Sequence, residues 1–317
     1  MNCIALVMAA AAFNCFPPEI RTVGVVMPAS IQPKARFDAG VEALKRAGLR
    51  IKLAKRLNFE TQASAADRAA DFEEMWMDPE VDLVICARGG KGSEDILSLL
   101  DWNRLRARDQ RVLGFSNITM ILNAMAKEKA GHPFSGSTIS HLLYAKGDSF
   151  EWLKTAIAGG PQPPAKLRAI RPGAFSGLPC GGHIALVKRG IDMNWACEAA
   201  GRVVFLERNN SASAKEIAAE LDAIAESGWL KDCAGVIFGD VTPGRGGKAE
   251  RGKRALPKEE REAARAEVER AKRAFAEKIG KPTYDGFAYG HVPVSHAVDF
   301  RRKVSVSEDG TMTWAER

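Results

Sequence analysis

The chain has 317 residues, of which 46% are hydrophobic and 27% charged, so it lies in the ordinary globular range and is long enough for one large or two modest domains. Its formal net charge of +7 and its pI of about 9.1 would suit an acidic substrate or an anionic polymer. Part of the excess is local, because residues 241–280 contain 12 Lys and Arg against 7 Asp and Glu. A solvated helix face is the commoner explanation of such a mixed run, and we expect no nucleic acid partner.

Residues 1–20 form a separate leader in our interpretation. The first 17 residues carry no charge, and an apolar run from Cys3 to Phe13 contains Ala10-Ala11-Ala12 as a candidate cleavage site. An export signal usually has a basic start, which is missing here. The run is also too short to span a membrane as a helix, so we expect no membrane association. We expect a cytoplasmic protein, with export through this segment as the alternative.

From Thr22 to about residue 127, short apolar runs alternate with amphipathic segments. The strands are expected at 23–27, 51–54, 82–87 and 112–115, and the helices at 37–47, 64–77, 94–100 and 118–127. This alternation predicts an α/β domain with a flavodoxin-like, doubly wound parallel sheet, whose ligands bind beyond the carboxyl ends of the strands.

A Gly- and Pro-rich stretch at 159–164 marks a domain boundary. We therefore expect a first domain over 21–160 and a second over 161–317. The second has strands at 203–206, 235–238 and 303–307, and helices at 214–226 and 258–279. None of the six cysteines stands in the C-x-x-C spacing of zinc sites and redox loops, so the sequence predicts no metal site.

Ser116 follows the strand at 112–115 and precedes a helix. A serine in such a sharp turn exposes its hydroxyl and receives the backbone N–H groups of the helix start, as a nucleophile requires. A plain helix cap is the alternative. Gly89-Gly90 follow another strand, and their bare backbone would suit an oxyanion hole or a phosphate site.

Glu207 ends the strand at 203–206, and His291 lies in a Gly-rich turn. A carboxylate that orients an imidazole, and an imidazole that accepts the serine proton, are what a nucleophilic serine needs. Taken singly, each residue has an ordinary structural interpretation as well.

Five separated motifs, taken together, resemble the LD-carboxypeptidase family, which includes the microcin-immunity peptidases. They are Gly89-Gly90-Lys91-Gly92, Gly114-Phe115-Ser116-Asn117-Ile118-Thr119, Gly181-Gly182-His183-Ile184, Phe205-Leu206-Glu207 and Gly290-His291. The resemblance runs from about Val23 to the C-terminus and implies a flavodoxin-like first domain with a smaller, β-rich second domain.

The resemblance also implies an activity. Family members are cofactor-free serine peptidases, usually homodimers, that remove the terminal D-amino acid of murein tetrapeptides in cell-wall recycling. Carried over, Ser116 is the nucleophile, His291 the general base and Glu207 its orienting partner. The backbone N–H groups of Gly90 and Asn117 would form the oxyanion hole. An alternative substrate is a peptide–nucleotide antibiotic of the microcin type.

Four departures from the family pattern bear on substrate choice more than on reaction type. Asn117 and Arg208 each stand where Asp is usual, His183 stands where Asn is usual, and Ser135-Gly136 stand where a His-Gly pair is common. The charge of Arg208 would lower the affinity for a cationic side chain. Two other functions compete: an α/β-hydrolase esterase, which predicts Gly where Ile118 stands, and a catalytically silent peptide or sugar receptor.

Overall fold

The computed structural model describes residues 16–246 and 255–316, and its first part is built on a six-stranded sheet. The strand order is β13-β5-β4-β3-β1-β2, and every pair is parallel except β13 with β5. The strands are β1 (Thr22–Val26), β2 (Arg50–Leu53), β3 (Leu83–Cys86), β4 (Arg111–Gly114), β5 (His132–Ser135) and β13 (Val298–Asp299). The central strands β1 and β3 are buried throughout, as is typical of a sheet covered on both faces.

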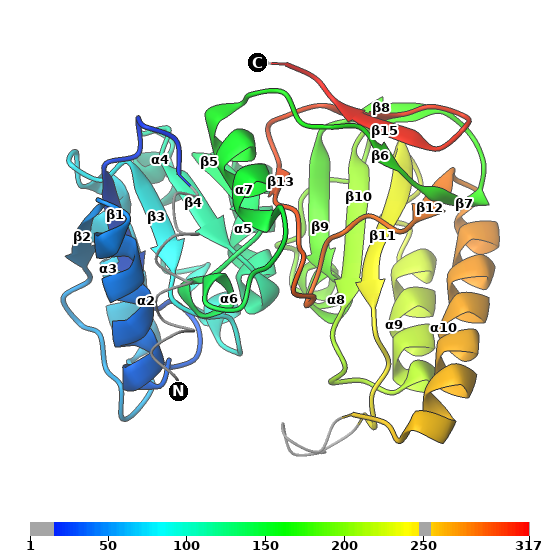
Figure 1. Ribbon diagram of the computed structural model, residues 1–317, viewed down its shortest axis with the longest axis horizontal. Helices are drawn as coiled ribbons and strands as arrows, with labels where there is room; N and C mark the ends of the chain where they lie inside the picture. Colours follow the sequence, from blue (N-terminus) through cyan, green and yellow to red (C-terminus); the bar gives the residue numbers. More distant parts are fainter. Residues whose placement is uncertain (1–15, 247–254, 317) are drawn as a thin grey trace. The chain divides into compact units, whose positions relative to one another are not determined.

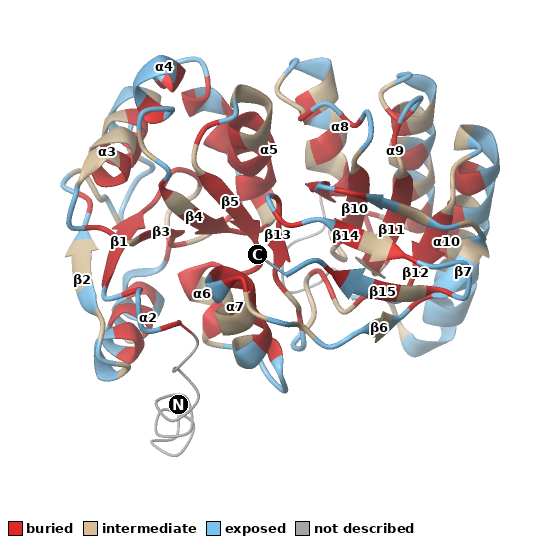
Figure 2. Ribbon diagram, turned by 90° about the horizontal axis from the view of Figure 1, so that it is seen from above, coloured by how far each residue is buried: buried red, intermediate tan, exposed pale blue. Residues whose placement is uncertain are grey.

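Helices cover the two faces of this sheet. Figure 2 shows α3, α4 and α5 on one face, and α2, α6 and α7 on the other. Their bounds are α2 (Lys34–Arg46), α3 (Ala65–Met77), α4 (Trp102–Leu105), α5 (Thr119–Glu128), α6 (Ile139–Leu142) and α7 (Ser149–Ala158). The packing is close: a Cβ on Gly24 would lie 2.3 Å from Met75 Sδ of α3. The predicted doubly wound fold of the first domain is confirmed.

A second, five-stranded sheet organises the later part of the chain, with order β7-β12-β11-β10-β9 (Figure 1). The bounds are β7 (Arg168–Arg171), β9 (Pro179–His183), β10 (Val203–Arg208), β11 (Gly235–Val241) and β12 (Thr283–Asp285). Strands β9 to β12 are parallel and β7 is antiparallel. A helix follows each of β9, β10 and β11 along the chain: α8 (Ile184–Asp192), α9 (Ala214–Glu226) and α10 (Lys258–Ile279).

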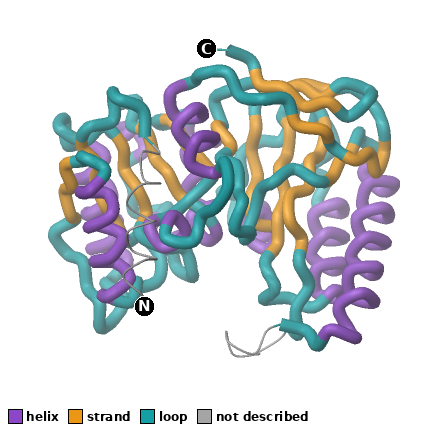
Figure 3. The backbone as a smooth tube through the Cα atoms, viewed as in Figure 1, coloured by secondary structure: helices purple, strands orange, loops and turns teal. Residues whose placement is uncertain are grey.

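A small antiparallel sheet completes the second part of the chain, with order β6-β15-β14-β8. Its strands are β6 (Ala165–Lys166), β8 (Phe175–Gly177), β14 (Val304–Val306) and β15 (Thr311–Trp314). Phe175 of β8 packs so closely on the start of β11 that a Cβ on Gly235 would lie 2.7 Å from its ring. The antiparallel sheet thus covers the amino ends of the parallel strands and does not cover their carboxyl ends (Figures 1 and 3). The predicted β-rich second domain is confirmed.

The chain divides into two compact units at Gly160–Pro161, but a short segment near the C-terminus returns to the first. Unit 1 contains residues up to 160 and Pro293–Arg301, whereas unit 2 contains Pro161–Val292 and Arg302–Arg317. The returning segment is anchored by a buried pair, His132 Nε2 to Asp299 Oδ1 at 2.6 Å, and by His296, whose ring stacks on Trp152 at 3.9 Å. No local pattern in the sequence predicts this return.

The basic helix and the N-terminal leader differ in how far the structure tests their predicted roles. Helix α10 spans 258–279 as predicted, but Lys272 is buried and bonded to Asp285 and Glu269, each at 3.1 Å, so the solvated interpretation is wrong for this side chain. Residues 1–15 of the leader lie outside the described residues, whereas Phe16 and Ile20 are buried. No helix in the described parts of the chain is both long and apolar enough to cross a membrane.

Candidate active site

Ser116 occupies a strained turn between β4 and α5. Phe115 is still extended, with φ of −156°, but Ser116 has φ of +63°, a left-handed conformation that costs a non-glycine residue free energy. The turn is tight, since a Cβ on Gly114 would lie 2.3 Å from Ile118 Cγ2. A single 3-10 turn, η2 (Ser116–Ile118), then leads into α5. Strain of this kind often marks a functional site.

The glycine-rich loop after β3 packs directly against Ser116. A Cβ on Gly89 would lie 2.7 Å from Ser116 Cβ and 3.0 Å from the backbone nitrogen of Asn117. Gly90 has φ of +111°, and a Cβ there would lie 2.3 Å from Ser30 Oγ. Glycine is therefore required at both positions, and the bare backbone that results can approach a ligand beside Ser116.

The side chain of Asn117 ties the two loops together. Its Oδ1 accepts a hydrogen bond from Ser93 N at 3.0 Å, and its Nδ2 donates to Glu94 Oε2 at 3.2 Å. Ser93 Oγ also donates to the Asn117 carbonyl at 2.7 Å. The aspartate that is usual in the family at this position has no N–H group and, when ionised, could not donate to Glu94. The amide of Asn117 can donate, and it therefore suits a buried position next to Glu94.

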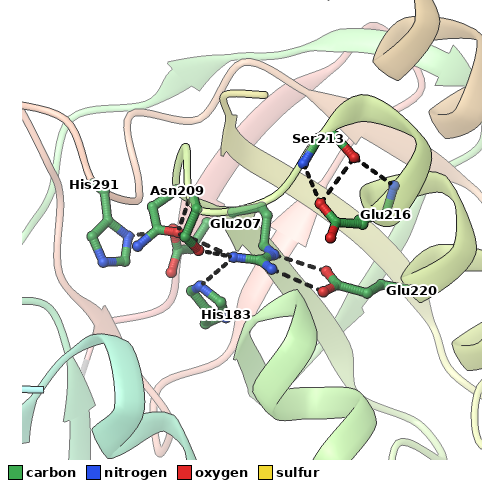
Figure 4. Close-up of polar contacts among 9 residues, drawn as sticks. His183, Glu207, Asn209, Ser213, Glu216, Glu220 and His291 are labelled. Carbon is green, nitrogen blue, oxygen red and sulfur yellow. Dashed lines mark hydrogen bonds and ion pairs between the residues drawn. The ribbon is translucent and has the colours of Figure 1, made fainter. Parts of the chain in front are cut away.

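Glu207 and His291 form a hydrogen-bonded pair at the carboxyl end of β10 (Figure 4). Glu207 Oε2 lies 2.8 Å from His291 Nδ1, and the Glu207 side chain is fully buried. Burial opposes ionisation, but His291, His183 and Arg208 outweigh it and hold the pKa of Glu207 below its ordinary value. Because a carboxylate only accepts hydrogen bonds, Nδ1 carries the hydrogen, and Nε2 of His291 is left as the proton acceptor.

His183 and Arg208 flank this pair. The rings of His183 and His291 lie edge to face at 5.8 Å, and His183 is paired with Glu207 in the register of β9 and β10. Arg208 is buried, and its guanidinium makes two bonds of 2.8 Å to Glu220 and approaches His183 Nε2 at 3.3 Å. The charge of Arg208 is therefore compensated by Glu220, which weakens the expectation that it repels a cationic side chain.

The neutral state of His183 makes stability depend on pH. Burial lowers the pKa of His183 to about 3, with Arg208 and His291 acting in the same direction against Glu207. An unfolded histidine binds a proton below about pH 6.5, so the unfolded state takes up more protons and the free energy of unfolding falls as the pH falls.

We expect protonation of His183 in the unfolded state to lower the free energy of unfolding by ~2 kcal/mol between about pH 7 and about pH 5. His183→Asn should therefore lose less stability over that interval than the unmodified protein. Urea unfolding at both pH values measures the difference. An equal decline in the two proteins would contradict a neutral, buried His183.

The predicted site residues fall into two groups. Ser116, Gly90 and Asn117 lie in unit 1, and Glu207 and His291 lie in unit 2. Within each group the structure brings the residues together. Three acidic residues close to these groups were not predicted from the sequence: Glu94, Glu220 and Asp240. Asp240 is on β11 as Glu207 is on β10, and a carboxylate at the carboxyl end of a parallel strand was a signal that could have identified it.

Both parts of the chain match the LD-carboxypeptidase family. Residues 23–136 match its N-terminal domain and residues 176–306 match its C-terminal domain. The chain therefore belongs to the LD-carboxypeptidase family.

Individual relatives agree with this assignment. The chain is 25% identical over 300 residues to a Bacillus subtilis protein named "Probable murein peptide carboxypeptidase", covering 90% of this chain and 88% of that one. It is 31% identical over 98 residues to the microcin C7 self-immunity protein MccF of Escherichia coli, covering 30% and 28%. The crystal structure of muramoyltetrapeptide carboxypeptidase from Oxalobacter formigenes has the same fold, with a TM-score of 0.75, 18% identity, and coverage of 92% of this chain and 97% of that one.

Proposed function

We propose that the protein is a serine-type LD-carboxypeptidase whose nucleophile is Ser116, whose general base is His291 and whose orienting carboxylate is Glu207. The observation that carries this proposal is the strained turn at Ser116, with φ of +63° between a buried strand and a helix start. The Glu207–His291 pair, with its 2.8 Å contact, supplies the second part. The triad requires Ser116 Oγ to come within hydrogen-bond reach of His291 Nε2.

The chemistry then follows in two steps. Ser116 Oγ attacks the carbonyl carbon of the scissile amide while His291 Nε2 takes its proton, and the oxygen becomes an oxyanion. His291 returns the proton to the leaving amine as the C–N bond breaks, which leaves an acyl-enzyme. Water then attacks the acyl carbon while His291 Nε2 takes its proton. The bond between the acyl carbon and Ser116 Oγ breaks, and His291 returns the proton to Oγ. Glu207 stabilises the imidazolium that forms in each step.

The backbone N–H groups of Gly90 and Asn117 are the proposed oxyanion donors. They belong to the two loops that meet at Ser116, where Gly89 leaves no side chain in the way. Preorganised backbone donors of this kind stabilise an oxyanion without moving during the reaction.

The proposed substrate is a murein tetrapeptide, from which the enzyme would release the terminal D-alanine. Names of relatives support this class, since they describe peptidases of murein peptides. The test is mass spectrometry of the products from a purified tetrapeptide. We expect a tripeptide and free D-alanine. An intact tetrapeptide, together with cleavage of a peptide–nucleotide antibiotic, would favour the MccF-like alternative.

A further inference from the structure

The carboxyl ends of three neighbouring parallel strands in unit 2 each carry a carboxylate. Glu207 is on β10, Asp240 on β11 and Asp285 on β12. These strands are adjacent in one sheet, in the order β12-β11-β10. The carboxyl edge of a parallel sheet is where ligands bind, so an uncompensated charge there would act on the ligand.

Two of the three carboxylates are held by nitrogen donors of the chain. Glu207 accepts a hydrogen bond from His291 Nδ1 at 2.8 Å. Asp285 is paired with Arg168 at 2.5 Å and with Lys272 at 3.1 Å.

Asp240 differs from both. Its Oδ2 accepts a hydrogen bond from Thr242 Oγ1 at 2.7 Å. Among residues 16–246 and 255–316, Asp240 makes no ion pair, and no donor reaches its Oδ1. The Thr242 bond holds the carboxylate in place without neutralising it.

The backbone places Asp240 beside the proposed catalytic pair. Asp240 N donates to the Tyr289 carbonyl at 2.7 Å, which fixes the end of β11 against the loop that carries His291. A Cβ built on Gly290 would lie 3.3 Å from Asp240 Cβ and 3.2 Å from Glu207 Cβ. Gly290 thus passes between the two carboxylates, and His291 is the next residue.

The surroundings of Asp240 favour a cation. Asp240 is half-buried, and burial raises the pKa of its carboxyl, with the charge of Glu207 acting in the same direction against the Thr242 bond. Two cations in the described part of the chain lie nearby and are already paired: Arg208 with Glu220, and Lys272 with Asp285 and Glu269. A positive group from a ligand would relieve the repulsion between Asp240 and Glu207.

We infer that Asp240 is a specificity-determining residue that binds a primary ammonium group on the substrate, close to the scissile amide. The inference rests on the proposed function, because it places the reacting amide next to His291. It reverses the expectation drawn from Arg208 alone, because Asp240 is a negative charge with no ion-pair partner among the residues that the structure describes. Among such tetrapeptides, we therefore expect Asp240 to favour those with an amino group on the side chain that precedes the terminal residue.

Two synthetic tetrapeptides test this inference. One is L-Ala-γ-D-Glu-L-Lys-D-Ala, and the other replaces lysine by norleucine, which has nearly the same shape and no charge. We expect the unmodified enzyme to prefer the lysine peptide by about tenfold to a hundredfold in kcat/KM, the range for a hydrogen bond between charged groups. Asp240→Asn should lower kcat/KM for the lysine peptide by about tenfold or more, and for the norleucine peptide by far less.

The ratio of the two kcat/KM values is insensitive to partial misfolding, because inactive protein lowers both equally. Asp192→Asn, at the exposed end of α8, removes the same charge and should keep the preference. Calorimetry of peptide binding to Ser116→Ala and to Ser116→Ala with Asp240→Asn gives a second measurement that needs no turnover. The lysine peptide should bind more weakly to the double variant.

The outcomes separate this inference from the function on which it rests. Equal hydrolysis of both peptides by the unmodified enzyme, or a preference that survives Asp240→Asn, would overturn the role of Asp240 and leave the proposed activity standing. Hydrolysis of neither peptide would overturn the proposed activity and this role together.

Discussion

Ser116→Ala is expected to abolish hydrolysis while leaving the fold intact. The substitution deletes the oxygen that attacks the carbonyl, and it keeps the Cβ that packs against the loop at Gly89. Loss of a triad nucleophile costs roughly 10⁴-fold or more in turnover. Steady-state hydrolysis of a tetrapeptide measures kcat, and circular dichroism checks that the variant folds.

A second serine provides the control for this prediction. Ser98 is exposed in the same unit, and Ser98→Ala should keep normal kcat and KM. Near-normal activity of Ser116→Ala would remove the basis for a serine-type mechanism in this chain.

Glu207→Gln is expected to reduce turnover almost as severely. Glutamine has the shape of glutamate, but it cannot stabilise an imidazolium by charge, and its amide can turn to donate to His291 Nδ1. His291 would then carry its hydrogen on Nε2 and could not accept the serine proton. We expect a loss of roughly 10³- to 10⁴-fold in kcat, as for the orienting carboxylate of other triads.

Two comparisons check that Glu207 acts through the triad. Glu226→Gln, an exposed residue at the end of α9, should be neutral. Adding Glu207→Gln to Ser116→Ala should cause little further loss, because residues that act as one unit are not additive. The pKa of Glu207 is held low in the folded protein. Its charge therefore stabilises the fold at pH values above the pKa of unfolded Glu207, and this stabilisation is lost as the pH falls through the folded pKa. Independent, additive effects would argue that Glu207 is only structural.

The order of strands and helices in the first domain was predictable from local pattern, and one short element was not. The expected helix over 94–100 is a single 3-10 turn, η1 (Ser93–Ile96). Its start follows Gly92, with φ of +97°, and Ser93 is bonded to Asn117 in the next loop. Such long-range hydrogen bonds leave no periodic signal in the sequence, whereas the apolar runs of β1 and β3 do.

The sequence alone selects Ser116, Glu207 and His291 as candidate residues, because each follows or ends a predicted element within a motif. It does not identify the side chains that bond to their neighbours. Glu94 accepts from Asn117, and Glu220 neutralises Arg208, yet both stand in segments that read as ordinary charged helix. Their roles depend on which elements pack together, and spacing along the chain does not encode that.

Mapping the adduct of a fluorophosphonate probe tests the central claim most directly, because the probe reacts with an activated serine. The protein is labelled, digested with trypsin and analysed by mass spectrometry, and residues 112–127 form one peptide between cleavage sites. The account predicts a single adduct on Ser116 that disappears in Ser116→Ala and is strongly reduced in His291→Ala. An adduct on another residue, or no adduct in a protein that hydrolyses the tetrapeptide, would contradict it.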